Sequence, residues 1–166
     1  SIKPNSVKTF KVKLKSSDAP VDKPLYASLA LDYDKKCVSW NEFRREADFS
    51  SGYSYAAELL PDSIVINSIP FILGEKEAAN GLTCKGDTIE LPAGNNYNRV
   101  YFLAASREGD NEGIFRLGKT EQTITVPEYT GFIGQWGHTG HTEGFLKEAE
   151  IAYVGTHRHA PGGDEA

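Results

Sequence analysis

Apolar and polar residues alternate along short segments of this chain, which is the pattern of β-strands that bury one face. In residues 7–15 the apolar side chains fall largely on one face, with a slip near Thr9 that predicts a β-bulge. Residues 25–33 alternate in the same way. The pattern predicts a strand in both segments, and residues 36–40 are expected to pair with the second strand as a hairpin across the turn at Asp34.

Further short apolar segments follow, with turn sequences rich in Gly, Asn and Asp between several of them. The strands expected there are residues 64–67, 71–73, 81–84, 88–91, 98–105, 113–117 and 122–126. Residues 101–105 are almost continuously apolar, which predicts a central strand covered on both sides. Only residues 44–47 and 75–79 are expected to form a turn of helix. The fold class predicted from this pattern is all-β, a two-sheet β-sandwich or jelly roll.

Composition narrows the classes of protein to which the chain could belong. Its 166 residues predict one domain over residues 1–166, and the net charge of −5 argues against a nucleic-acid partner. No apolar run approaches the length of a membrane span, so no membrane contact is expected. The chain contains no methionine and ends in a polar, turn-like segment, which favours a piece excised from a longer protein. No compartment is assigned.

The two cysteines, Cys37 and Cys84, lie in separate strand-like segments. They could form a disulfide, or they could be buried thiols that behave as small apolar side chains. We favour the thiols, because a fold of this size does not need a covalent link to be stable.

The segment 131–159 holds all four histidines, one of the two tryptophans and six of the sixteen glycines. Loops of such composition are where binding groups usually lie. The glycines allow the loop to fold back tightly. His157 and His159 are two positions apart, and residues with this spacing share one face of a strand. We therefore expect one shared surface for binding carbohydrate or another domain, formed by Trp136, His138, His141, Glu143, His157, Arg158 and His159.

The chemistry of that surface admits several interpretations. Imidazoles with Glu143 could hold zinc, but no HExxH motif is present and a Gly-rich spacing defines no coordination geometry. We favour histidines that donate and accept hydrogen bonds, and we expect no metal and no cofactor in this chain. Trp136 beside Gln135 has the chemistry of a sugar site, in which an aromatic ring meets C–H faces. It could equally cap the core of the sandwich.

The carboxylates do not indicate catalysis. Asp32 and Asp34 would share a strand face and could help bind calcium, although turn and surface roles are commoner for aspartate. A glycosidase needs two carboxyl groups on opposite sides of the glycosidic bond, and nothing in the sequence pairs any two. No nucleophile elbow or phosphate-binding loop is present. No catalytic residue is expected, and the chain is not expected to be an enzyme.

Three segments carry a family resemblance: DFSSGYSYAAELLP (48–61), LPAGNNYNRVYFLAAS (91–106) and GFIGQWGHTGHTEGFLKEAEIAYVGTHRH (131–159). Together with the trailing GGDEA they resemble a C-terminal β-sandwich region of bacterial glycoside hydrolase family 38 enzymes, the α-mannosidases. The second segment is also similar to galactose-binding-like modules of many glycosidases. The chain departs from the family at Gly137, where an acidic residue is expected, and it stops short of a further strand-like segment.

The resemblance implies a function but not an activity for this chain. In that family a zinc ion and an aspartate nucleophile lie in a catalytic domain that matches nothing here. It therefore implies a non-catalytic accessory domain, with zinc only in the parent catalytic domain. The implied partners are the catalytic domain of the same chain and a mannose-containing glycan. Two alternatives are a free-standing metal-dependent enzyme that uses the C-terminal histidines and a purely structural domain.

Overall fold

The computed structural model describes residues 24–130 and 150–165 of the chain. The described residues contain strands, one 3₁₀ helix and long irregular segments, so the all-β prediction is confirmed. The elements are β1 (Val38–Ser39), η1 (Asn41–Glu46), β2 (Ser54–Ala56), β3 (Ser63–Ile66), β4 (Ile69–Ile72), β5 (Asn111–Leu117), β6 (Thr120–Val126), β7 (Arg158–Ala160) and β8 (Gly163–Glu165). No helix in these two ranges is long and apolar enough to cross a membrane.

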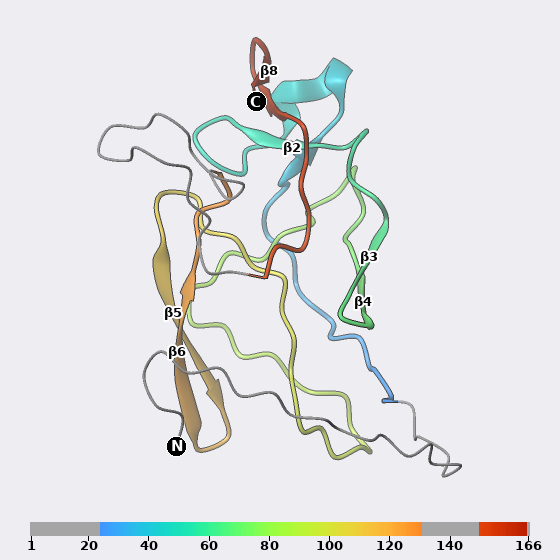
Figure 1. Ribbon diagram of the computed structural model, residues 1–166, viewed down its shortest axis with the longest axis vertical. Helices are drawn as coiled ribbons and strands as arrows, with labels where there is room; N and C mark the ends of the chain where they lie inside the picture. The colour runs from blue at the N-terminus through green and yellow to red at the C-terminus, as the bar shows by residue number, and fades with distance from the viewer. Residues whose placement is uncertain (1–23, 131–149, 166) are drawn as a thin grey trace, which may run out of the picture.

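The largest sheet has four short strands in the order β1-β2-β7-β8. Strands β1 and β2 run parallel, whereas β7 is antiparallel to both β2 and β8. The sheet therefore joins the C-terminal strands to strands more than 100 positions earlier in the chain, with His159 opposite Ser54. Figure 1 shows this sheet and η1 together at one end of the molecule, beside the C-terminus.

Two antiparallel hairpins form the other sheets among the described residues. Strands β3 and β4 are joined by a two-residue turn at Asn67 and Ser68, both with positive φ (50° and 66°). A turn of this kind matches the natural twist of a hairpin. Strands β5 and β6 form a longer ribbon of seven residue pairs, from Asn111–Val126 to Leu117–Thr120.

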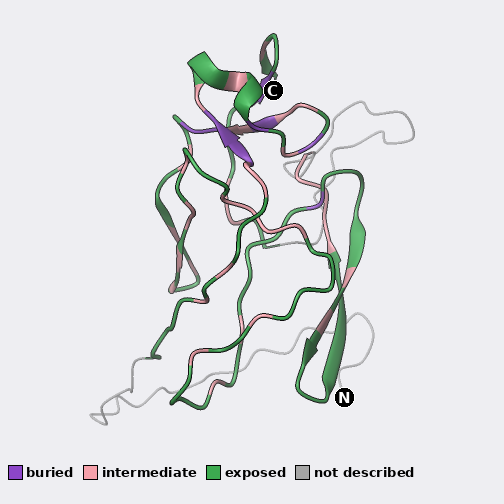
Figure 2. Ribbon diagram, turned by 180° about the vertical axis from the view of Figure 1, so that it is seen from behind, coloured by how far each residue is buried: buried purple, intermediate pink, exposed green. Residues whose placement is uncertain are grey.

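Buried side chains gather at the end of the molecule that carries the four-stranded sheet and η1 (Figure 2). Cys37, Val38 and Ala57 form the buried cluster, and larger side chains pack against it. Two of these, Phe49 and Tyr55, have ring centroids 5.1 Å apart. Tyr129 completes the aromatic group at 4.9 Å from Phe49 and 5.8 Å from Tyr55. This packing stabilises the four-stranded sheet, whose strands are only two or three residues long.

Several predicted strands are confirmed and others are wrong. Strands β3, β4, β5 and β6 overlap the predicted segments 64–67, 71–73, 113–117 and 122–126, and η1 includes most of the predicted turn at 44–47. Residues 81–84 and 88–91 form no strand; Gly81 makes only an isolated bridge to Lys35. The strand predicted for residues 7–15 lies outside the described residues.

The predicted hairpin between residues 25–33 and 36–40 is wrong. Residues 25–33 form no strand, and Leu25 is 93% exposed. Strand β1 pairs with β2 instead. The backbone N–H of Tyr55 in β2 donates a hydrogen bond to the carbonyl of Cys37, and that of Ala57, the residue after β2, donates one to the carbonyl of Ser39. A long-range parallel partner thus replaces the local one.

The strand predicted at residues 98–105, with its doubly covered part at 101–105, is also wrong. Residues 98–105 form no strand, and Tyr101, Phe102 and Leu103 are exposed. Apolar composition suggests burial, but only tertiary contacts can cover both faces of such a segment. Both cysteines are free thiols, as favoured, but only Cys37 is buried, whereas Cys84 is exposed.

Candidate functional site at the C-terminal strands

Two of the expected histidines and one aspartate meet where β7 and β8 pair. His159 on β7 lies opposite Asp164 on β8, and His157 precedes β7 by one residue. One possible ligand atom from each of the three lies within 4.8 Å of the others. The Nε2 atom of His157 is 3.8 Å from Oδ2 of Asp164, and the two imidazole rings are stacked with centroids 5.7 Å apart. The two rings thus lie side by side, although His157 lies just outside β7.

The buried His159 is part of a hydrogen-bonded chain with two serines. Its side chain is only 1% exposed, and its Nδ1 lies 3.0 Å from Oγ of Ser39. The Ser39 hydroxyl is in turn 2.7 Å from Oγ of Ser54. If Nδ1–H donates to Ser39, the lone pair of the neutral imidazole is on Nε2. Burial lowers the pKa of His159, with Arg44 adding to the effect, so the neutral ring is favoured.

Two carboxylates and Arg44 surround the histidines. Oε2 of Glu58 lies 3.5 Å from Nε2 of His159, while its Oε1 accepts a hydrogen bond from the backbone N–H of Asn41. Burial alone would raise the pKa of Glu58, but backbone hydrogen bonds and His159 lower it overall. Arg44 pairs with Oδ1 of Asp164 at 2.5 Å and lowers the pKa of that carboxyl. Both carboxylates are therefore ionised near neutral pH.

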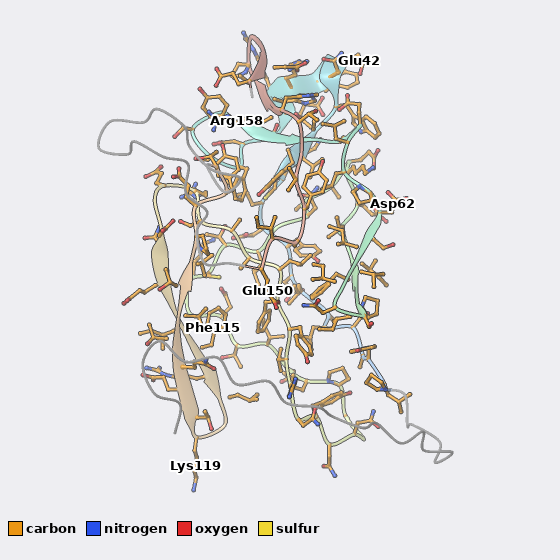
Figure 3. The ribbon with its side chains drawn as sticks, viewed as in Figure 1. Glu42, Asp62, Phe115, Lys119, Glu150 and Arg158 are labelled. Carbon is orange, nitrogen blue, oxygen red and sulfur yellow. The ribbon has the colours of Figure 1, made fainter. Side chains whose placement is uncertain are left out.

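Arg158 contacts a different set of side chains. Its guanidinium donates to the Tyr129 hydroxyl at 2.8 Å, stacks 3.9 Å from the Tyr53 ring centroid and pairs with Glu165 at 3.2 Å. Successive side chains of a strand point to opposite faces, so this contact set is expected for the residue between His157 and His159. Figure 3 shows Arg158 at the same end of the molecule as η1. Trp136, His138, His141 and Glu143 lie outside the described residues.

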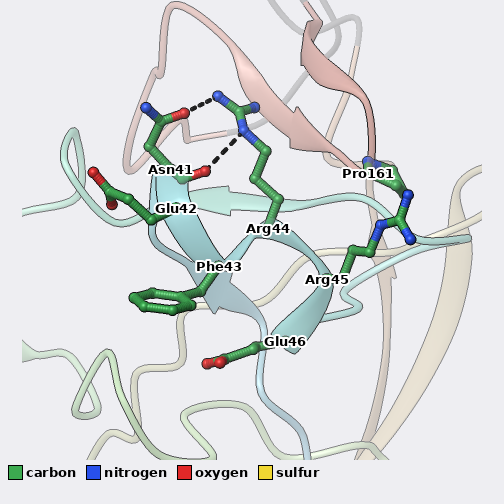
Figure 4. Close-up of a pocket in the computed structure, with 7 residues that line it drawn as sticks. All are labelled: Asn41, Glu42, Phe43, Arg44, Arg45, Glu46 and Pro161. Atoms are coloured by element: carbon green, nitrogen blue, oxygen red, sulfur yellow. Dashed lines mark hydrogen bonds between the residues drawn. The ribbon is translucent and has the colours of Figure 1, made fainter.

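An open hollow of about 420 Å³ lies next to this cluster, along η1 and Pro161. Figure 4 shows its lining residues, which are Asn41, Glu42, Phe43, Arg44, Arg45, Glu46 and Pro161. Phe43 is 56% exposed among charged and amide side chains. Arg44 links the two features, because its guanidinium also contacts the side chain and backbone carbonyl of Asn41.

The hollow was not predicted from the sequence, which indicated only a turn of helix at residues 44–47 in this region. One feature of the sequence could have indicated it. Phe43 is the single apolar residue in NEFRRE (41–46), so a helix formed there has no apolar face that would bury the Phe43 ring. A second, smaller hollow of about 130 Å³ is mostly apolar and lies between the β3–β4 hairpin and residues 101–103.

Comparison with known proteins places this β architecture in a family. A family model described as an AziU2-like β-sandwich domain matches residues 25–166. The chain belongs to this family. The match to AziU2-like β-sandwich domains confirms the predicted sandwich fold and covers both the hollow and the histidine cluster. The search of curated proteins and the search of solved structures each gave no match.

The AziU2-like family is not the glycoside hydrolase family that the sequence resembles. What the match supports of that resemblance is the β-sandwich domain and not membership of the α-mannosidases. The family description states no ligand, substrate or partner.

Proposed function

We propose that this β-sandwich is a non-catalytic accessory domain that binds glycan in the hollow along η1. The observation that carries the proposal is the exposed ring of Phe43 beside polar side chains of the same short helix. A large apolar side chain that is exposed within a hollow is a common feature of ligand-binding surfaces.

The residues of the hollow suit a sugar ring. An aromatic face accepts the C–H face of a pyranose, while planar amide and carboxylate groups satisfy the sugar hydroxyls. In Figure 4 the Phe43 ring lies between the carboxylates of Glu42 and Glu46, on the side of η1 away from Arg45 and Pro161 in this view. Arg44 and Asn41 contact each other, which limits the motion of one wall. Restricting the side chains in advance lowers the entropy lost when a ligand binds.

The proposed partner domain follows from the resemblance of three segments to α-mannosidases. On that basis the glycan contains mannose, and the domain packs on a catalytic domain in the same chain. Coding sequence for a catalytic domain directly upstream would support this part of the proposal. Absence of such a coding sequence would contradict the proposed partner domain, and the proposed glycan site would then rest only on the residues of the hollow.

The glycan site is tested by titrating manno-oligosaccharides into the purified chain and measuring heat or protein-detected NMR shifts. Phe43→Ala should weaken binding by about fivefold or more, because stacking of this kind contributes roughly 1–3 kcal/mol by analogy with other ring systems. Tyr26→Ala is the matched control, since Tyr26 is an aromatic residue of similar exposure outside the hollow.

Equal binding by Phe43→Ala and the wild-type chain would show that glycan binds elsewhere. No binding of any manno-oligosaccharide by the wild-type chain would overturn the proposed function. Circular dichroism should be the same for both variants, because Phe43 is exposed and supports no buried contact.

A further inference from the structure

We propose that His157, His159 and Asp164 bind one divalent metal ion of the late first transition row, such as Zn²⁺. None of the three proposed ligands lines the glycan hollow, although Arg44 contacts both places, and the site goes beyond the proposed function. The sequence favoured a hydrogen-bonding role for the histidines, because the order of residues defined no coordination geometry. The pairing of β7 with β8 supplies that geometry by placing Asp164 opposite His159.

The distances are close to those of a metal site. Zinc binds imidazole nitrogen and carboxylate oxygen at about 2.0–2.2 Å, so neighbouring ligand atoms in a tetrahedral site lie roughly 3.3–3.5 Å apart. His157 Nε2 and Asp164 Oδ2 are 3.8 Å apart, and all three ligand atoms lie within 4.8 Å of one another. Side-chain rotations that bring these atoms about 1 Å closer would complete the contacts.

The surroundings of His159 support a ligand role. Metal-bound histidines almost always use their second ring nitrogen for a hydrogen bond that fixes the tautomer and the ring orientation. Here Nδ1 lies 3.0 Å from Ser39 Oγ, which leaves Nε2 on the other side of the ring, 3.5 Å from Glu58 Oε2. The buried Ser39–Ser54 pair restricts the Ser39 hydroxyl further. His159 is thus already oriented for coordination.

The mutually close ligand atoms come from His157, His159 and Asp164, and a second carboxylate, Glu58, lies beside His159. Glu58 Oε2 is 3.5 Å from His159 Nε2, and its other oxygen is held by the backbone of Asn41. Arg44 occupies Oδ1 of Asp164 and leaves Oδ2 beside His157. The Asp164 carboxylate can therefore bind a metal through Oδ2 while Arg44 holds Oδ1.

The donor set selects the class of metal. Two imidazoles suit zinc, copper, cobalt or nickel, whereas calcium and magnesium prefer sets made of oxygen alone. The ion would connect β7 and the residue before it with β8. In a sheet whose strands have two or three residues, such a link would stabilise the C-terminal end of the domain.

The test measures Co²⁺ binding by visible absorption and Zn²⁺ binding by calorimetry on the full, tag-free chain. All proteins carry Cys84→Ser, which removes the exposed thiol as a competing ligand. His157→Ala and Asp164→Asn are compared with Asp62→Asn, a carboxylate that also pairs with a cation, Lys76 at 3.4 Å. His157 is partly exposed, so its replacement should leave the fold intact, which circular dichroism verifies.

The expected result is one equivalent of metal bound by the reference protein and by Asp62→Asn. Both ligand variants should bind the metal at least about 10-fold more weakly, since loss of a residue that only supports a ligand already lowers metal affinity by roughly 10- to 100-fold. Zinc should raise the melting temperature of the reference protein and not of the ligand variants. Failure of the reference protein to bind either metal would overturn the proposal, as would binding that both ligand variants retain unchanged. Neither result depends on Phe43 or on glycan.

Discussion

At the residue scale, Ser39 determines how the buried His159 is oriented. Its hydroxyl lies between Nδ1 of His159 and the hydroxyl of Ser54, and all three side chains are almost completely buried. A buried polar network of this kind stabilises a fold only while each member keeps its partner. The residue therefore supports both the sheet and the candidate metal ligand.

Replacing Ser39 with alanine should lower the free energy of unfolding by about 1–3 kcal/mol, because His159 Nδ1 and Ser54 Oγ both lose a partner. Urea denaturation followed by tryptophan fluorescence measures the change. Ser63→Ala, at an exposed serine at the start of β3, should change stability by less than about 0.5 kcal/mol. Equal effects of the two substitutions would show that the buried network contributes no stability.

The two thiols should differ in reactivity. Burial raises the pKa of Cys37 from 9.0 to about 11, which lowers its thiolate fraction at pH 8 by about 100-fold. Cys84 is exposed. Iodoacetamide should therefore label Cys84 first in the native protein, and both cysteines at comparable rates in urea, as measured by peptide mass spectrometry. Fast labelling of Cys37 without urea would contradict the buried position.

Asp34 should titrate well below an ordinary aspartate. Hydrogen bonds from Lys85 and the backbone of Thr83 lower its pKa from 3.8 to about 2. Because the folded value is depressed, its contribution to stability is complete above pH 4 and is lost as the pH falls toward 2. NMR titration of the Asp34 carboxyl measures this, and Lys85→Ala should move the midpoint upward. A midpoint unaffected by Lys85→Ala would exclude this ion pair in solution.

At the element scale, short strands are held by close contacts with irregular segments. The backbone of Gly81 is hydrogen-bonded to the backbone of residues 34 and 35, which lie four and three positions before the start of β1. A Cβ atom at Gly81 would overlap Sγ of Cys37. This approach places the irregular segment after residue 80 against the buried cluster.

Gly81→Ala should therefore lower the free energy of unfolding by about 1–3 kcal/mol through overpacking beside Cys37. Gly162→Ala is the matched control in the β7–β8 turn, where an added Cβ meets no heavy atom within 4 Å. Thermal unfolding of both variants gives the comparison. A Gly81→Ala protein as stable as the control would show that β1 and its neighbours shift freely to admit the methyl group.

At the scale of the whole molecule, the chain is expected to bind without catalysing hydrolysis. Glu42 and Glu46 line the proposed glycan hollow, but both flank one aromatic ring on a single short helix (Figure 4). Glycosidases instead hold two carboxyl groups on opposite sides of the bond that is cleaved.

Incubation of the pure chain with an aryl α-mannoside should release no phenol above the buffer control. The same assay on Glu42→Gln and Glu46→Gln distinguishes activity of the chain from a contaminant. Cleavage by the wild-type chain that either substitution abolishes would show that the domain is an enzyme.

The local sequence by itself determined the all-β class and the positions of four strands. The apolar pattern predicted segments that overlap β3, β4, β5 and β6, and the structure pairs each of these strands with its neighbour in the sequence. The expectation that His157 and His159 lie side by side followed from the two-residue period of a strand.

Only the tertiary structure decided the four-stranded sheet and what surrounds the histidines. Residues 25–33 and 98–105 have the composition of strands, yet neither forms one, because pairing depends on which distant segment supplies a partner. Ser39, Glu58 and Asp164 reach His159 from three separate parts of the chain. No local pattern encodes such contacts, because they arise when loop closure brings distant residues together and packing against the buried cluster holds them there.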